Sequence, residues 1–236
     1  MPKYRIAELN VEMAPKHPTL LRQGEPYLYD FSGEADVVVD FSEEFYAQKL
    51  KEHPELTPDL CEYLWMGFGF YRKLVQYDGL MLHASALAYQ GRAYLFSAPC
   101  GTGKSTHTSL WRKTFGEDVV ILNDDKPALR QIEGVYHAFG TPFSGKTDQN
   151  VNIGVPLGGI CILERSKENW IKRVQGKDVI FPLMHQTLRP PDAQNMDRLL
   201  ANLDQLLRTV PIYRMGCNIS EDAARLACET MQGGLE

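Results

Sequence analysis

The sequence predicts an α/β fold, in which a P-loop core follows a small β-rich N-terminal part. Three observations favour this class. Short apolar runs alternate with segments of helical periodicity. A glycine-rich stretch stands between a predicted strand and a predicted helix. The length of 236 residues suits one substantial α/β domain with a small satellite, so we divide the chain into residues 1–78 and 79–236.

The N-terminal part is predicted to contain short strands followed by helices. Alternating apolar and polar residues indicate strands at 4–7, 27–31 and 37–39. A first helix is expected over 43–53. A second helix is expected after Thr57-Pro58-Asp59, because an N-cap residue, a proline at the first helical position and an early acid follow one another there.

The core is predicted to open with a β-hairpin. Two apolar runs, 80–87 and 93–97, are joined by Tyr89-Gln90-Gly91-Arg92. Further elements follow the same periodicities. They are a helix over 104–113, strands over 119–122, 159–163, 170–174 and 211–215, a long helix after Asp192, and a last helix capped by Ser220.

Composition and charge narrow the function classes. A net charge of −5 favours neither nucleic acid nor an anionic membrane as a partner. The first residues lead into no apolar run, so we expect no signal peptide, and no segment approaches the ~18 apolar residues that span a bilayer. The five cysteines are odd in number and lack CxxC spacing, which disfavours a disulfide framework or a zinc site. We therefore predict a cytoplasmic protein.

The strongest motif is the glycine-rich loop, residues 98–105, with the sequence APCGTGKS. Glycines allow consecutive N–H groups to surround a phosphate chain, and the N-terminus of the following helix adds positive potential. Lys104 would reach the outer phosphates, and the Ser105 hydroxyl would coordinate magnesium. Ala98 replaces the first glycine of the usual pattern, where a positive φ would be strained. The alternative is a chance glycine-rich turn. The expected nucleotide-binding residues are Pro99, Cys100, Gly101, Thr102, Gly103, Lys104, Ser105 and Thr106.

A pair of carboxylates follows the next apolar strand, at Asn123-Asp124-Asp125. Carboxylates at the end of a buried strand beside a phosphate-binding loop hold magnesium or abstract a proton. The alternative is an acidic turn, since Asn-Asp pairs favour turns. A third candidate is His83, on the strand before the glycine-rich loop, although a lone histidine in an apolar strand is more often a core residue.

Together these motifs resemble the HPr kinase/phosphorylase family, whose core is shared with phosphoenolpyruvate carboxykinase. His83-Ala84-Ser85, the hairpin, the glycine-rich loop and Asn123-Asp124-Asp125 occur in the order and approximate spacing of that family. The ending, from Val210-Pro211-Ile212-Tyr213-Arg214 to Ser220-Glu221-Asp222-Ala223-Ala224, is similar to small HPr-kinase-like proteins. The resemblance covers residues 79–230.

The resemblance implies a role for each matching residue. His83 would be the active-site histidine, and Lys104 the phosphate-binding lysine. Ser105 would be a magnesium ligand, with Asp124 as its partner in the metal site. Asp125 would be the general base on the acceptor hydroxyl, although adjacent carboxylates titrate as a pair.

The chain also departs from that family. Thr106 stands where the family carries a glutamate, and no Glu-Val-Arg-Gly-like segment follows. These departures argue against HPr as the substrate and leave no basis for the reverse phosphorylase reaction. The loop over 140–146 offers Ser144 and Lys146 as candidates for the acceptor site, with a solvated loop as the alternative.

We therefore predict an ATP- and magnesium-dependent kinase that transfers the γ-phosphoryl group to a hydroxyl. The acceptor would be a serine of a protein or peptide, or a small metabolite. One alternative is a nucleotide-dependent ATPase switch, in which Asp125 orients water. The other is a pseudo-kinase that binds nucleotide and recruits a partner without chemistry. A homo-oligomer is left open.

Overall fold

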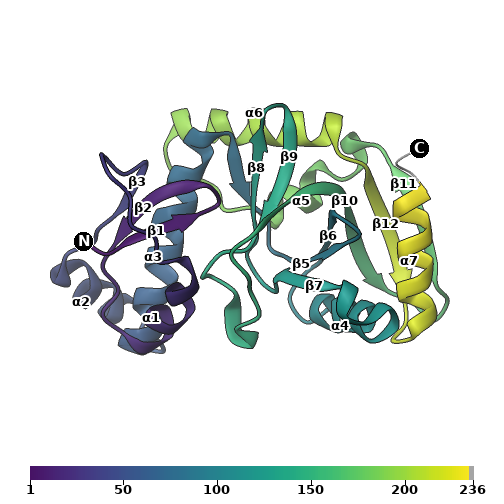
Figure 1. Cartoon of the computed structure of the whole chain (residues 1–236), viewed down its shortest axis with the longest axis horizontal. Helices are drawn as coiled ribbons and strands as arrows, with labels where there is room; N and C mark the ends of the chain where they lie inside the picture. Colours follow the sequence, from purple (N-terminus) through teal and green to yellow (C-terminus); the bar gives the residue numbers. More distant parts are fainter. Residues whose placement is uncertain (234–236) are drawn as a thin grey trace.

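Two β-sheets and the helices around them make up the protein, seen in a computed structural model that describes residues 1–233 (Figure 1). A three-stranded sheet lies in the N-terminal part, and a nine-stranded sheet forms the core. The fold is thus mixed α/β, as predicted. The division of the chain near residue 79 stays a prediction.

The N-terminal sheet has the strand order β1-β2-β3, with β2 antiparallel to β1 and parallel to β3. The helices α2 and α3 are capped by the side chains of Ser42 and Thr57. The elements are β1 (Lys3–Ile6), β2 (Leu9–Met13), α1 (Pro18–Gly24), η1 (Glu25–Tyr27), β3 (Val37–Val39), α2 (Glu43–Glu52), α3 (Pro58–Leu74) and η2 (Val75–Tyr77).

The prediction of a strand at 27–31 is wrong. Only Tyr27 of this segment lies in the 3₁₀ helix η1, Leu28 makes a single antiparallel bridge to Tyr4, and 29–31 belong to no helix or strand. Pro26 lies in the first turn of η1, where its fixed φ suits a helical turn and its missing N–H is not needed. The strand β2 and the helix α1 were not expected.

The core sheet has the order β4-β8-β9-β10-β6-β5-β7, and β12 joins it beside β10 with β11 on its far side. The strand β10 runs parallel to β6 and β12, whereas the other pairs are antiparallel. The strands are β4 (Gly79–Met81), β5 (Ala84–Tyr89), β6 (Arg92–Ser97), β7 (Val120–Asn123), β8 (Ala128–Ile132), β9 (Val135–Phe139), β10 (Gly154–Arg165), β11 (Trp170–Val174) and β12 (Ile212–Cys217).

The apolar run 80–87, expected as one strand, is broken in the middle. Its first part is β4, which pairs with β8, and its second part is β5, which pairs with β6 and β7. At the break the His83 N–H donates to the Gln186 carbonyl at 2.7 Å. His83 therefore takes no part in strand pairing. It lies at the edge of the sheet where β6 ends and the glycine-rich loop begins.

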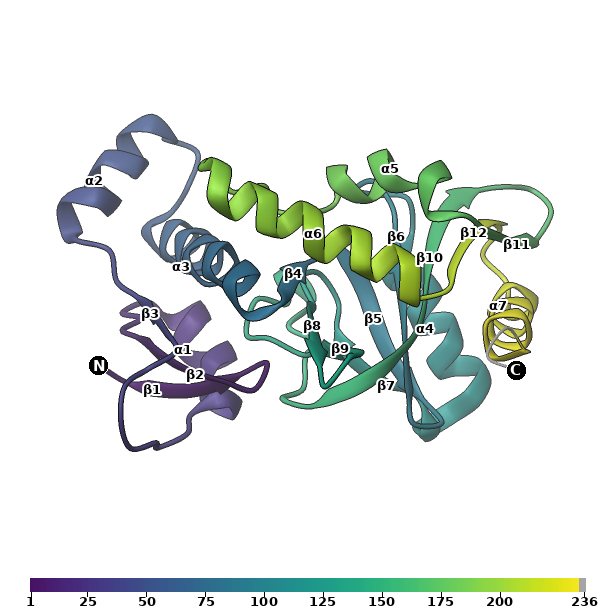
Figure 2. The ribbon, with the colours of Figure 1, turned by 90° about the horizontal axis from the view of Figure 1, so that it is seen from above.

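Helices cover both faces of the core sheet (Figure 2). Leu95 packs in the cluster with α5 and α6, whereas its neighbours Tyr94 and Phe96 pack in the cluster with α4 and α7. This alternation follows from the two-residue period of a strand. The remaining elements are α4 (Lys104–Phe115), η3 (Gly116–Asp118), η4 (Gly145–Thr147), η5 (Gly176–Asp178), α5 (Ile180–His185), α6 (Ala193–Thr209) and α7 (Glu221–Gly233).

The N-terminal part packs directly on the core. Phe143, from a core loop, is fully buried, and its ring lies 6.0 Å from that of Phe70 and 5.6 Å from that of Tyr71, both in α3. The N-terminal part is therefore held beside the loop that leads into η4, which carries the acceptor-site candidates. Across residues 1–233, no helix combines the length and the apolar character that a bilayer crossing requires.

Candidate functional site

The glycine-rich loop connects β6 to α4 and is shaped by two residues with positive φ. Gly101 has φ 76° and Gly103 has φ 121°, a region that side chains rarely adopt. The helix α4 begins at the next residue, Lys104, so its first free N–H groups face the loop. The strain expected at Ala98 is absent, since Ala98 is not among the residues of 1–233 with positive φ.

Lys104 is buried beneath this loop. Its Nζ donates to the Ala98 carbonyl at 3.0 Å. Burial lowers the pKa of Lys104, while Cys100, Asp125 and Asp124 act in the opposite direction. An anion placed within the loop would favour the charged ammonium and so offset the cost of its burial.

Asp124 follows β7 and is held by the neighbouring strand. Its Oδ1 accepts a hydrogen bond of 2.6 Å from the Ser85 hydroxyl, which also lies 2.8 Å from the Thr108 hydroxyl. Its Oδ2 is buried and has no hydrogen-bond partner within residues 1–233. A buried, unpartnered carboxylate oxygen is costly unless it binds a cation or a donor. Asp124 is therefore suited to bind a metal ion through Oδ2.

Asp125 lies between two cationic or potentially cationic groups. Its Oδ1 is 3.3 Å from His83 Nε2, and its Oδ2 accepts a hydrogen bond from Lys126 Nζ. Burial alone would raise the pKa of Asp125, but the hydrogen bond from His83 and the charge of Lys126 outweigh it and lower that pKa. Asp125 is therefore ionised near neutral pH.

The side chain of Asn123 shapes the turn that presents both carboxylates. Its Oδ1 accepts from the N–H groups of Asp125 and Lys126 at 2.9 and 2.7 Å, and its Nδ2 donates to Thr141. Asn123 is fully buried, so these bonds form away from water. The turn expected for an Asn-Asp sequence is present, and it directs Asp125 toward His83.

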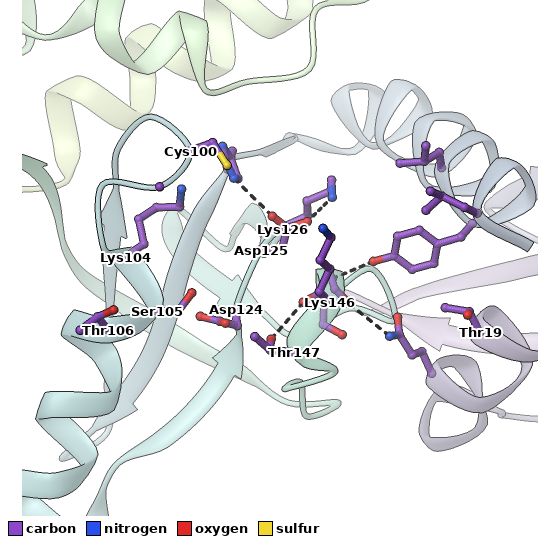
Figure 3. Close-up of a pocket in the computed structure, with 18 of the residues that line it drawn as sticks. Thr19, Cys100, Lys104, Ser105, Thr106, Asp124, Asp125, Lys126, Lys146 and Thr147 are labelled. Atoms are coloured by element: carbon purple, nitrogen blue, oxygen red, sulfur yellow. Dashed lines mark hydrogen bonds and ion pairs between the residues drawn. The ribbon is translucent and has the colours of Figure 1, made fainter. Parts of the chain in front are cut away.

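His83, Lys104 and the two aspartates line one cavity of about 780 Å³ between the core and the N-terminal part. Figure 3 shows Lys104 and Thr19 on opposite sides, with Asp125, Lys126 and Lys146 between them. Of the predicted site residues, His83, Cys100, Gly101, Gly103, Lys104, Ser105, Thr106, Asp124, Asp125, Ser144 and Lys146 all line this cavity. Ser144 is buried there and Lys146 is exposed.

A second cavity of about 600 Å³ lies on the other side of the glycine-rich loop. Arg165, at the end of β10, crosses to the loop and donates to the carbonyls of Gly101 and Thr102 at 2.5 and 3.3 Å. The lining residues are Gly101, Thr102, Gly103, Thr106, His107, Leu110, Arg165, Ser166, Cys217, Asn218 and Ile219. Pro99 borders neither of the two cavities.

The N-terminal part contacts the site through the η4 loop. Gly145 has φ 71°, and a Cβ added to it would lie 2.8 Å from the Asp125 Cβ, so only glycine allows this close approach. The Gly145 N–H donates to the Tyr63 hydroxyl at 2.8 Å, and its carbonyl accepts from Gln23 Nε2 at 3.4 Å. Two N-terminal side chains thus hold the loop that rests on Asp125.

Sequence reasoning assigned no role to several residues of the site. Ser85 belongs to the His83-Ala84-Ser85 motif of the resemblance, which is the one signal that could have marked it. Lys126 directly follows the aspartates. No local pattern marks Gln186, whose Oε1 lies 2.8 Å from His83 Nδ1, or Tyr63 and Gln23 in the N-terminal helices.

Comparison with known proteins identifies one family. The model of the SynChlorMet cassette protein ScmC family matches residues 50–222, which include α3 as well as most of the core. No curated protein matches the chain. Among solved structures, the chain is similar to the Hpr(Ser) kinase/phosphatase from Coxiella burnetii, with 10% identity, 66% of this chain and 99% of that chain covered, and a TM-score of 0.39. Because the family model spans well over half of its length, the chain belongs to the SynChlorMet cassette protein ScmC family.

Proposed function

We propose that the protein is a cytoplasmic, ATP- and magnesium-dependent kinase that transfers the γ-phosphoryl group to a hydroxyl. One observation carries the proposal. The Asp125–His83 pair lies in the same cavity as Lys104 and the glycine-rich loop, and that cavity leaves about 780 Å³ for reactants. A general base beside a phosphate-binding lysine, with room for a second substrate, is the arrangement that phosphoryl transfer to an alcohol requires.

The nucleotide would bridge the two cavities. The triphosphate would lie on the N–H groups of the glycine-rich loop and the start of α4, with its terminal phosphate near Lys104. The nucleoside would then occupy the second cavity, where Leu110 and Ile219 offer apolar contacts. Arg165 supports this route, because its bonds to the carbonyls of Gly101 and Thr102 place a cation beside the loop that would hold the phosphates.

Magnesium would be held by Ser105 and Asp124. Within residues 1–233 no group of three or more His, Cys, Asp or Glu side chains is arranged to hold a metal. Magnesium does not need such a group, since it commonly uses one or two protein ligands with substrate phosphates and waters. The buried Asp124 Oδ2 supports the fit. The ion, when bound, would neutralise charge that develops on the transferred phosphate.

The residues around Asp125 define the acceptor chemistry. The oxygen of the acceptor hydroxyl would attack the γ-phosphorus, and ADP would leave. The Asp125 carboxylate would accept the proton of that hydroxyl. His83, across from Gln186, would donate a hydrogen bond to the carboxylate or to a phosphate oxygen. Catalysis would rest mainly on positioning and on charge neutralisation by Lys104 and the loop N–H groups.

The test of this proposal is nucleotide binding followed by transfer. Calorimetry should show magnesium-dependent binding of ATP to the wild-type protein. Labelled phosphate from γ-labelled ATP should then appear on an acceptor in a metabolite and peptide screen. Label found as free phosphate alone would favour the ATPase switch. Binding without turnover would favour a nucleotide-binding scaffold.

A further inference from the structure

Cations outnumber carboxylates around the main cavity, although the whole chain carries a net charge of −5. Within residues 1–233, the carboxylates that line it are those of Asp124 and Asp125. The cations that line it are Arg22, Lys104, Lys126 and Lys146. A cleft lined by an excess of one charge raises the local concentration of ligands of the opposite charge. The cavity therefore favours anions, of which the proposed nucleotide is one.

Most of these cations have a counter-charge. The phosphates of the proposed nucleotide would balance the lysine of the glycine-rich loop. Arg22 pairs with Asp148 at 2.9 Å, and Lys126 pairs with Asp125. Lys146, by contrast, makes no ion pair within residues 1–233, and it is exposed in the cavity. One cation of the cavity thus remains available for a second anion.

The η4 turn places Lys146 near the candidate base. Lys146 follows Gly145, where an added Cβ would lie 2.8 Å from the Asp125 Cβ. The Gly145 N–H donates to the Tyr63 hydroxyl at 2.8 Å, so α3 fixes the turn that carries Lys146. Figure 3 shows the Lys146 side chain pointing into the cavity, toward the pair of Asp125 and Lys126. An acceptor whose hydroxyl faces Asp125 therefore lies within reach of Lys146.

The charge near Lys146 selects among hydroxyl compounds. A bound acceptor displaces water from the ammonium, and an anionic group on that acceptor replaces the water with a charge-assisted hydrogen bond. A neutral polyol offers only the weaker bond of a hydroxyl. When Asp125 takes up the proton it becomes neutral, so the charge of Lys126 is no longer balanced. An anion at this position is therefore bound more strongly as the reaction proceeds, which favours turnover.

We propose that the acceptor is a small hydroxy compound with a carboxylate or phosphate group, and that Lys146 binds this anionic group. The cavity volume of about 780 Å³ is typical of small-molecule sites. The acceptor hydroxyl gives its proton to Asp125, and its oxygen bonds to the γ-phosphorus as the bond to ADP breaks. The inference rests on the proposed kinase activity and narrows its acceptor to a small anion.

The experiment measures label transfer from γ-labelled ATP with the full-length protein. The acceptors are hydroxy acids and sugar phosphates, each paired with its neutral amide or parent sugar, and, separately, serine peptides. Variants Lys146→Met and Lys146→Arg are compared with the wild type. Lys177→Met is the matched control, because Lys177 also follows a glycine in an exposed 3₁₀ turn, η5, but lies outside the cavity. Thermal unfolding checks that each variant is folded.

The inference predicts a higher kcat/KM for the anionic member of the best pair, and the better anion identifies the group as carboxylate or phosphate. Added salt should reduce this preference. Lys146→Met should lower the ratio of the two kcat/KM values about tenfold, the effect of one lost hydrogen bond to a charged group. Lys146→Arg should keep most of the preference because it keeps the charge, and Lys177→Met should match the wild type.

Two results would overturn the inference and leave the kinase proposal standing. One is more efficient transfer to a neutral compound or a serine peptide than to any small anion. The other is an unchanged ratio for the best pair in folded Lys146→Met. Label found in no acceptor, or released only as free phosphate, would overturn the kinase proposal, and the inference with it.

Discussion

His83 Nε2 lies 3.3 Å from Asp125 Oδ1, although β5 and β7 deliver the two residues from separate segments of the chain. At the break between β4 and β5, His83 makes no strand pairing. Its N–H donates to the Gln186 carbonyl, and its ring Nδ1 lies within hydrogen-bond distance of Gln186 Oε1. His83 therefore contacts Asp125 with 29% of its side chain exposed, and it is not a packed core residue.

This relationship predicts that His83→Ala lowers turnover more than stability. We expect kcat to fall by about tenfold or more, because the carboxylate loses a donor, and His83→Gln should recover little. Melting temperature and kcat of the purified variants give the comparison. A large drop in melting temperature with unchanged kcat would show that the role of His83 is structural.

Substitution of Asp124 and of Asp125 should impair different steps of the reaction. Asp125→Asn should leave ATP binding intact while slowing the chemical step by about 10²-fold or more, as for a lost general base. Asp124→Asn should instead weaken the response to magnesium. Single-turnover rates over a magnesium titration separate the two profiles. Exchange of these profiles between the variants would reverse the assignment.

Lys104→Ala should abolish turnover and weaken ATP binding, since the outer phosphates lose a charge-assisted contact. Lys113→Ala is the matched control, because Lys113 lies on the same helix and makes an exposed ion pair with Glu221. Calorimetry and turnover should show no change in the control. Near-wild-type turnover in Lys104→Ala would remove the glycine-rich loop from the mechanism.

His107 predicts an acid dependence of stability. It is buried, its Nε2 accepts from the Trp111 Nε1–H at 3.2 Å, and burial lowers its pKa from 6.5 to about 4. Between these two pKa values, His107 is protonated in the unfolded chain and neutral in the folded chain. The free energy of unfolding should fall as pH drops from about 6.5 to about 4, by up to about 3 kcal/mol.

Urea unfolding of the wild type and His107→Gln, in magnesium-free buffer across that pH range, isolates this contribution. Other groups titrate in both proteins, so only the difference between the two curves counts. The free energy of unfolding of the wild type should fall relative to that of His107→Gln as the pH drops from about 6.5 to about 4. Parallel curves would show that His107 is protonated without cost.

The sequence predicted most of the core, because its elements depend on local signals. The pair Gln90-Gly91 does turn between β5 and β6 with positive φ at both residues. The cap residues Thr57, Asp192 and Ser220 each accept a hydrogen bond at the helix that they were expected to begin. The chemistry-bearing residues also gathered in one cavity, because their strands end at a common edge.

What the sequence did not show depends on contacts between distant segments. The partnership of His83 with Gln186 forms only when the chain near α5 packs beside the strand break. Gln23 and Tyr63 enter the site only because α1 and α3 dock against the η4 loop. Neither contact follows a period or a spacing, so no local pattern predicts it.

The central claim is that this site moves a phosphoryl group from ATP to a hydroxyl. The most direct measurement is a single-turnover reaction of wild type and Asp125→Asn with γ-labelled ATP, magnesium and the serine-peptide and metabolite acceptors, separating phosphoester from free phosphate. The account predicts label in an acid-stable phosphoester with the wild type, and about 10²-fold slower formation of that product with Asp125→Asn. Label found only as free phosphate, or equal rates for the two proteins, would contradict it.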